Sequence, residues 1–215
     1  MFLSTLASGS AKGFGFSLQS GPTVIGQSYG GGYYAGKINV SGTQYYLIVA
    51  PKATGENSSV QWKTSNTSTT GTSSVIDGPT NSSNMNNASH PAAQFCEDLS
   101  IGGYTDWYMP AKNELEVLYY YFKPTTTANN TSSGSNANAV SPEPVSTNYT
   151  TGAPAQTTIT AYQTGNSEAF ATTYYRSSTE YDATGAWSQS FNQGLQSNTL
   201  KSDSYYVRAV RRIPV

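Results

Sequence analysis

Acidic residues that could act as general acid and base are concentrated in one stretch of this 215-residue chain. They are Asp106, Glu114 and Glu116, and paired carboxylates can transfer protons when their environments hold one of them protonated. Glu114 and Glu116, however, fall in the early turns of a predicted helix, and Asp106 precedes it. Carboxylates in these positions stabilise a helix N-terminus. We therefore expect this acidic set to cap the helix and to bind buried backbone amides rather than to catalyse.

The candidate nucleophiles lack a base. The hydroxyl run from Ser177 to Thr179 has no His or Lys beside it in the sequence, and nucleophilic catalysis by a hydroxyl needs one. The single cysteine, Cys96, lies on the apolar side of a predicted helix, so we expect it in the core; the single histidine, His90, should cap that helix or lie at the surface. One cysteine allows neither a disulfide nor a cysteine metal cluster. We predict no enzymatic activity, no cofactor and no metal.

Two amphipathic helices are predicted between Ser89 and Phe122. The first carries an apolar stripe with helical spacing, formed by Ala92, Phe95, Cys96 and Leu99. The second begins near Pro110 and presents Leu115, Leu118, Tyr119 and Phe122 on one side. Between them, Trp107 lies in a short apolar corner. These helices should supply most of the helical part of the core.

The composition is weakly charged and rich in tyrosine and glycine. Charged residues make up 11% and apolar residues 36%, with 17 Tyr and 20 Gly. This palette suits surfaces that bind by stacking and hydrogen bonding, and it is equally typical of β-rich extracellular structural proteins. The net charge of −1 and the lack of a basic run predict no binding to nucleic acid or anionic lipid. No apolar run is long enough to predict membrane insertion.

The remaining apolar residues predict strands separated by long polar loops. A hairpin is expected from residues 33–40 and 44–50, and three further strands from residues 172–179, 186–191 and 205–212. Residues 52–88 and 125–170 should be irregular, with Trp62 and Val75 among the residues that anchor the first loop. The order of these elements predicts an α+β fold with both termini in one sheet. We expect an N-terminal arm over residues 1–25 and one domain over residues 26–215.

The N-terminal residues lack the basic start and the apolar core of a signal peptide, so we expect no export signal. An extracellular type of composition without an export signal is explained by a virion protein, which is made in the host cytoplasm and released by lysis.

Four blocks in the same order resemble the Lcl-type lectin-like domain. They are GQSYGGGYYAGKI with YYLIVA, AAQFCEDLSIGGYTDWYMPAKNELEVL, YYRSSTEYDATGAWSQSFNQG and YYVRAVRR, and they cover about Ile25 to Arg212. That family is a variant of the C-type lectin-like fold and occurs in bacterial surface proteins and in bacteriophage tail-fibre and other virion proteins. The resemblance implies two helices packed on an antiparallel sheet, with long loop insertions.

The chain departs from the family pattern at three places. Tyr108-Met109-Pro110-Ala111 replaces an Arg-Leu-Pro-Thr corner, and Arg176 stands where a tryptophan precedes Ser-Ser. In calcium-dependent sugar-binding lectins, Glu-Pro-Asn and Trp-Asn-Asp triplets bind the metal. This chain has Glu143-Pro144-Val145 and no Trp-Asn-Asp, so we expect no calcium-dependent sugar binding.

The resemblance implies a binding face around the last strands, where aromatic rings flanked by amides suit sugars or protein epitopes. The residues expected there are Tyr174, Arg176, Tyr181, Asp182, Asn192, Gln193, Gln196, Asn198 and Asp203. The alternative, that each is an ordinary polar turn residue, stays open. The expected structural core comprises Phe95, Trp107, Pro110, Leu115, Trp187 and Phe191.

The implied function is that of a bacteriophage virion protein exposed on the particle, in a tail fibre or tail tip that binds the host surface. Its partners would be a host-cell glycan or protein and other virion proteins. A homo-oligomer, with a trimer favoured, would form through the N-terminal arm. The alternatives are a head decoration or head-fibre protein with a structural role and, less favoured, a bacterial surface adhesin.

Overall fold

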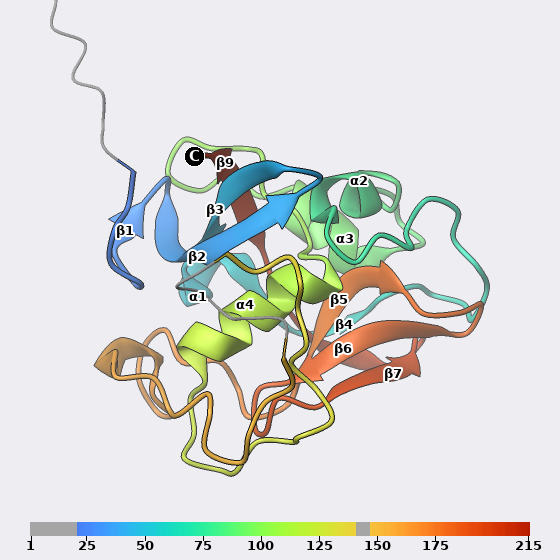
Figure 1. The fold of residues 1–215 in the computed structure, drawn as a ribbon. Coiled ribbons are helices and arrows are strands. Elements are labelled where there is room, and N and C mark those ends of the chain that lie inside the picture. Colours follow the sequence, from blue (N-terminus) through green and yellow to red (C-terminus); the bar gives the residue numbers. More distant parts are fainter. Residues whose placement is uncertain (1–20, 141–146) are drawn as a thin grey trace, which may run out of the picture.

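The computed structural model describes residues 21–140 and 147–215, and Figure 1 shows two β-sheets with helices packed against them. The first sheet has the order β1-β2-β3-β9, formed by Ser28–Tyr29, Gly32–Val40, Thr43–Val49 and Val210–Pro214. The second has the order β4-β8-β5-β6-β7, formed by Glu56–Gln61, Ser204–Arg208, Tyr174–Glu180, Gly185–Ser190 and Gln196–Leu200. Apart from the parallel contact of β5 with β8, the paired strands are antiparallel. The α+β class is confirmed.

The described helices are α1 (Lys52–Gly55), α2 (Gly78–Ser83), α3 (Pro91–Glu97), α4 (Lys112–Phe122) and a short 3-10 turn (Thr160–Tyr162). Both predicted helices are present, as α3 and α4, and α4 packs against β2 of one sheet and β5 and β6 of the other. None of the helices in residues 21–140 and 147–215 is long and apolar enough to cross a membrane. The predicted arm lies outside the described residues over positions 1–20.

Glu114 caps α4 as predicted. Its buried carboxylate accepts the backbone N–H of Ala111 and the hydroxyl of Tyr108, both at 2.8 Å. The same role was expected of Asp106, and that prediction is wrong, because both Asp106 oxygens bind the guanidinium of Arg211, at 2.7 and 2.9 Å. The cap therefore depends on one carboxylate supplied by the helix itself.

The last predicted strand is divided. β8 belongs to the second sheet and β9 to the first, with Ala209 between them. The Ala209 N–H donates to the Gly55 oxygen at 2.9 Å, and the Ala209 oxygen accepts the Ala50 N–H at 3.0 Å. The chain thus crosses from one sheet to the other while its backbone stays hydrogen-bonded. β1 and β9 both belong to the first sheet, at its two edges, so the first and last described strands share one sheet.

The prediction of an irregular first loop, over residues 52–88, was only partly right. The loop includes β4, which was expected to be irregular, and its Val75 side chain is 38% exposed instead of anchoring the loop. Trp62 is the anchor that the sequence predicted: it is fully buried, and its Nε1 donates to the Ser177 oxygen at 3.0 Å. His90 is also buried; its two ring nitrogens lie 2.9 Å from side-chain oxygens in the same loop.

Of the expected core residues, Trp107, Pro110, Leu115 and Phe191 are buried, as is Cys96. The prediction was wrong for Phe95 and Trp187, which are half-buried. In α3 the fully buried side chains are Ala92, Ala93 and Cys96. These small side chains face the core, which leaves the larger Phe95 ring on the flank of the helix.

A second buried carboxylate orders the long loop that follows α4. Glu116 accepts the amide of Asn136 at 2.7 Å and the hydroxyl of Tyr149 at 2.8 Å. Burial raises the pKa of Glu116 to about 7, although both hydrogen bonds oppose the rise. The loop is irregular, as predicted, but the described part of it binds its own domain through polar contacts.

We predict that Trp107→Ala lowers the free energy of unfolding by about 3–5 kcal/mol, because the indole is 1% exposed and its removal leaves a cavity. Trp187→Ala, at a half-buried position, should cost less. Urea denaturation of the two variants measures the difference. Equal losses would show that Trp107 is not part of the core.

The raised pKa of Glu116 predicts a pH effect. A folded-state pKa of about 7 against an ordinary value of 4.5 favours folding when the carboxyl is protonated; this contribution is lost as the pH rises from 4.5 through 7. Glu116→Gln, which does not ionise, should therefore gain stability relative to the natural chain between pH 5 and pH 8, by up to about 3 kcal/mol. Denaturation at both pH values tests this, and a constant difference would contradict it.

Candidate functional site

The predicted binding face does not form one surface. Its residues lie at both ends of β6 and on both faces of the second sheet. Gly185 and Ser190 lie five residue steps apart along β6, which corresponds to about 17 Å. Residues near the two ends therefore cannot contact the same small ligand, and the face has to be divided.

At one end, Asn192, Gln193 and Gln196 hold the loop that begins at Thr125. The Asn192 oxygen accepts the Thr125 hydroxyl at 2.8 Å, and the Gln193 oxygen accepts a loop amide at the same distance. The backbone N–H of Gln196 donates to the Ser133 hydroxyl at 3.0 Å. These three residues bind their own chain, so we remove them from the candidate site.

The face of the second sheet opposite to Trp187 and Gln189, which we call the outer face, carries Arg176. This residue is fully buried, so its prediction as an exposed binding residue is wrong. Its guanidinium donates to the backbone oxygens of Leu200 and Asp203, both at 2.6 Å, and lies 4.7 Å from the Tyr205 ring centre. Burial lowers its pKa to about 10. Tyr174 packs edge-to-face on Tyr205 with centroids 5.7 Å apart, and the Asp203 side chain is exposed. Arg176 therefore holds the β7–β8 turn in place.

At the other end of β6, exposed apolar groups gather. The Tyr181 ring is 51% exposed and meets Trp187 edge-to-face, with centroids 5.0 Å apart and an interplanar angle of 87°. Asn198 is opposite Trp187 in the strand register and is also exposed, and Leu200, two residues on, is 48% exposed. We call these four residues, with Lys112 at their edge, the aromatic platform.

The extent of α4 explains why this end of the sheet is open. Gly185, Trp187 and Gln189 alternate onto the side of β6 that faces α4 and its loop. Gln189 is buried and donates to the Tyr149 hydroxyl at 3.1 Å. The helix begins at Lys112, whose Nζ lies 4.4 Å from the centre of the Trp187 ring. Beyond that point α4 supplies no cover, and in Figure 1 the β6–β7 end extends away from the helix.

Asp182 fixes the turn beside the platform. Its Oδ1 accepts the backbone N–H groups of Gly185 and Thr184 at 2.7 and 2.8 Å. These two hydrogen bonds hold the pKa of the Asp182 carboxyl below its ordinary value, so the group stays charged and the turn stays closed. Because this turn is already ordered, Tyr181 is held in place before a ligand binds. Binding therefore costs less conformational entropy than it would at a flexible turn.

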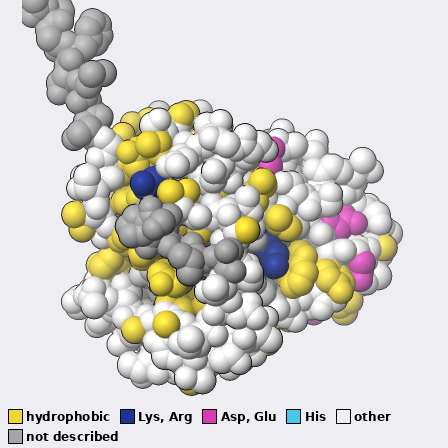
Figure 2. All heavy atoms as spheres, viewed as in Figure 1, with side chains coloured by type: hydrophobic (Ala, Val, Ile, Leu, Met, Phe, Trp, Pro, Cys, Tyr) yellow, Lys and Arg dark blue, Asp and Glu magenta, His cyan; other side chains and the backbone are white. Residues whose placement is uncertain are grey.

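The surface around the platform is weakly charged. Figure 2 shows hydrophobic side chains in separate patches among uncharged polar atoms, with few charged groups on the face in view. In residues 21–140 and 147–215 there is no group of three His, Cys, Asp or Glu side chains that could hold a metal ion. The platform therefore offers stacking, hydrogen bonding by Asn198 and one cation, Lys112, and the exposed Asp182 carboxylate lies beside it.

Sequence reasoning missed Lys112 and Leu200 and placed Trp187 in the core. The alternation of Trp187 with Gln189 did indicate their shared face. The sequence does not show that α4 begins beside Trp187 and leaves the end of β6 beyond it uncovered, because this depends on how the helix crosses the sheet.

Arg176→Ala should lower the free energy of unfolding by at least about 2 kcal/mol, since it empties a fully buried position and removes the guanidinium that donates to the Leu200 and Asp203 oxygens. Tyr181→Ala should cost less than about 1 kcal/mol, because it removes mainly one ring contact at an exposed position. Urea denaturation of both variants measures this contrast. A larger loss for Tyr181→Ala would show that the tyrosine is structural and would remove it from the site.

Comparison with known protein families matches residues 53–211 to the Lcl C-terminal domain. No protein with a curated description matches the chain. The matched segment includes α3, α4, the whole second sheet and the aromatic platform. It thus covers most of the 215 residues and includes the second and third blocks and nearly all of the fourth, whereas the first block, within residues 26–50, lies outside it. The chain belongs to the Lcl C-terminal domain family.

Proposed function

We propose that this chain is a host-binding module of a bacteriophage tail fibre or tail tip, exposed on the virion, and that it is not an enzyme. The observation that carries the proposal is the aromatic platform: Tyr181 and Leu200 are about half exposed although neither is needed to close the core. Exposed aromatic and apolar groups at an ordered turn are typical of binding surfaces. Membership of the Lcl C-terminal domain family supports this proposal, because the family that the chain resembles occurs in bacterial surface proteins and in bacteriophage virion proteins.

The chemistry of the platform favours a host-cell glycan or a protein epitope as the receptor. A sugar stacks its apolar face on an exposed ring and donates hydroxyl groups to amides such as that of Asn198. Lys112 adds one cation beside Trp187, at 4.4 Å from the ring centre. Burial lowers the pKa of Lys112, and the charge of Glu116 opposes this effect. One cation gives little electrostatic attraction, so specificity should come from shape and hydrogen bonding.

We also propose that the fold is C-type lectin-like. Three features support it: the first and last described strands share a sheet, two helices pack on the sheets, and long irregular segments follow β4 and precede β5. The runner-up role, a head decoration or head-fibre protein, would use the same fold for structural contacts with other virion proteins. A bacterial surface adhesin is a third, less favoured alternative.

For assembly we propose a homo-oligomer, with a trimer favoured, joined through residues 1–25. The apolar residues Phe14, Phe16 and Leu18 are separated by glycine and serine, so they suit burial against neighbouring chains better than a core of their own. They lie outside the described residues, and the proposal rests on their sequence alone.

We predict that Tyr181→Ala combined with Asn198→Ala abolishes phage adsorption to host cells while the melting temperature stays close to that of the natural chain. A few exposed side chains can contribute about 2 kcal/mol or more each to binding but add little to stability. The matched control is Tyr174→Ala, which removes a tyrosine on the opposite face of the sheet. Adsorption by virions carrying each variant is the measurement.

Normal adsorption by the double variant would reject the platform as the receptor site. If virions lacking the protein also adsorbed normally but broke on heating, the head decoration role would replace the proposed one. Loss of adsorption in the Tyr174→Ala control alone would move the site to the outer face of the sheet.

A further inference from the structure

An apolar groove lies beside the last turn of α4, and it shares no lining residue with the aromatic platform. Its volume is about 430 Å³. Tyr120 and Tyr121 of α4 contribute two rings that meet edge-to-face, with centroids 5.2 Å apart. The rest of the lining comes from residues 152–159 and from Ile25. The groove thus joins three parts of the domain that are distant in sequence.

The wall formed by residues 152–159 is fixed to the end of α4. The backbone N–H of Thr157 donates to the Lys123 oxygen at 2.9 Å, and the side-chain amide of Gln156 donates to the Pro124 oxygen at 2.7 Å. The Lys123 ammonium in turn donates to the Pro154 oxygen at 3.2 Å. The groove is therefore formed in advance, and a partner that binds there does not have to order it.

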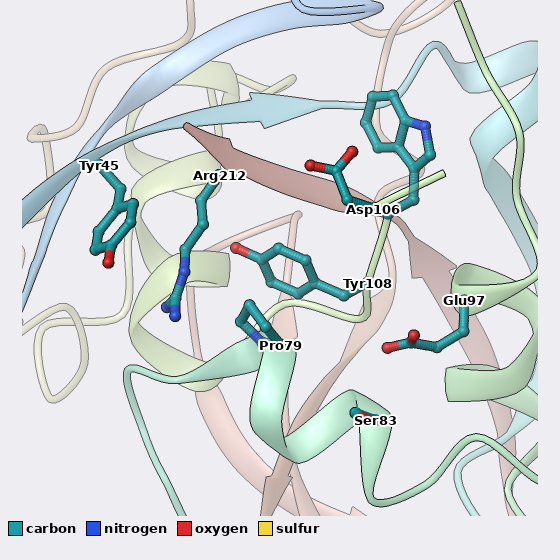
Figure 3. Close-up of a pocket in the computed structure, with 8 residues that line it drawn as sticks. Tyr45, Pro79, Ser83, Glu97, Asp106, Tyr108 and Arg212 are labelled. Carbon is teal, nitrogen blue, oxygen red and sulfur yellow. The ribbon is translucent and has the colours of Figure 1, made fainter. Parts of the chain in front are cut away.

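The groove also differs in charge from the cavity of similar volume beside the corner before α4. That cavity, of about 440 Å³, carries the charged side chains of Glu97, Asp106 and Arg212 in its lining (Figure 3). Among the described residues, those that line the groove include no Asp, Glu, Lys, Arg or His. An uncharged, largely apolar lining favours an occupant that is itself apolar and nearly uncharged.

The first 20 residues of the chain, which lie outside the described residues, have this chemistry. Lys12 is the single charged side chain among them, and Phe14, Phe16 and Leu18 alternate with glycine and serine. The described chain begins at Gly21, and an extended segment from residue 14 to residue 20 can span about 23 Å. The two phenylalanines can therefore lie well outside the domain to which they belong.

The described chain begins on the far side of the first sheet from its own groove. Gly21 lies against Tyr46, since a β-carbon at this glycine would be 2.2 Å from the Tyr46 hydroxyl. Tyr46 points away from α4, because its neighbours Tyr45 and Leu47 pack in the same core cluster as α4 and side chains alternate along a strand. In Figure 1 the described chain begins above β1, whereas the last turn of α4 lies below it. An arm would have to turn back around the sheet edge to enter its own groove, and the arm of a neighbouring chain would not.

We propose that this groove binds residues 14–18 of the arm of a second copy of the chain, with the two phenylalanine rings packed against Tyr120 and Tyr121. The contact removes apolar surface from water on both chains, which is the main driving force of such association. This inference rests on the homo-oligomer proposed above and gives it an interface, but it does not depend on the host-binding role.

Disulfide crosslinking of the full-length chain tests the proposal. Phe16→Cys combined with Ala155→Cys places one thiol on the arm and one at an exposed position in the groove lining, and the natural Cys96 is buried. After mild oxidation we expect covalent dimers and larger species on a non-reducing gel, because each disulfide joins two chains. Phe16→Cys with Ala128→Cys is the matched control: Ala128 is exposed in the loop after α4 but does not line the groove, so its chains should stay separate on the gel.

A charge in the groove should separate the chains. Ala155→Arg should raise the dissociation constant of the oligomer by tenfold or more, because it places a long cation among apolar side chains. Ala128→Arg should leave the oligomer intact, and both variants should keep the melting temperature of the natural chain, since both positions are exposed. Light scattering over a range of protein concentrations measures the mass of each variant.

Three results would overturn the proposal, and they differ in what they leave standing. A disulfide that closes within one chain would show that the arm occupies its own groove. An oligomer that persists in Ala155→Arg, with no crosslink in the paired cysteine variant, would place the interface elsewhere and leave the proposed assembly intact. A natural chain with the mass of a single copy would refute the assembly itself.

Discussion

The fold depends on one fully buried cation, Arg208, at the junction of the two sheets. Its guanidinium donates to the Ala50 oxygen at the end of β3, at 2.9 Å, and to the Glu168 oxygen at 2.8 Å, and it also binds the Glu168 carboxylate. Glu56, at the start of β4, lies 3.9 Å away. A planar group with five donors can join one sheet, the other sheet and the loop before β5 at once. A buried charge of this kind is tolerated only when it is paired and hydrogen-bonded, and here it is both.

The same use of charge recurs in the long loops. Lys123 donates to two loop carbonyls, at 2.6 and 3.2 Å, and Glu116 binds an asparagine and a tyrosine from the following segment. Lys201 pairs with Glu180 at 3.3 Å while its side chain is fully buried. Because charged residues are only 11% of the chain, their use inside the fold leaves a surface of tyrosine, amides and hydroxyls. That distribution suits the recognition by stacking that we propose for the aromatic platform.

Local patterns predicted local structure, and contacts between distant residues account for what they missed. The hairpin of β2 and β3, the helix α4 and the burial of Trp107 follow from spacing that can be counted along the sequence. The last strands carry three arginines with distant partners: Arg208 pairs with Glu56 and Glu168, Arg211 with Asp106, and Arg212 with Asp77. Arg176 was expected in the binding face that the family resemblance implies, but the β7–β8 turn covers it. Neither the cover nor the partners can be read from a pattern of a few residues.

The central claim is that the aromatic platform contacts the host receptor, and site-specific photocrosslinking tests it most directly. Virions would carry a photoreactive phenylalanine analogue in place of Tyr181, and matched virions would carry it in place of Tyr174 on the opposite face of the sheet. The account predicts a crosslink to a host-surface molecule from position 181 and none from position 174. A crosslink from position 181 only to other virion proteins, or equal host crosslinks from both positions, would contradict it.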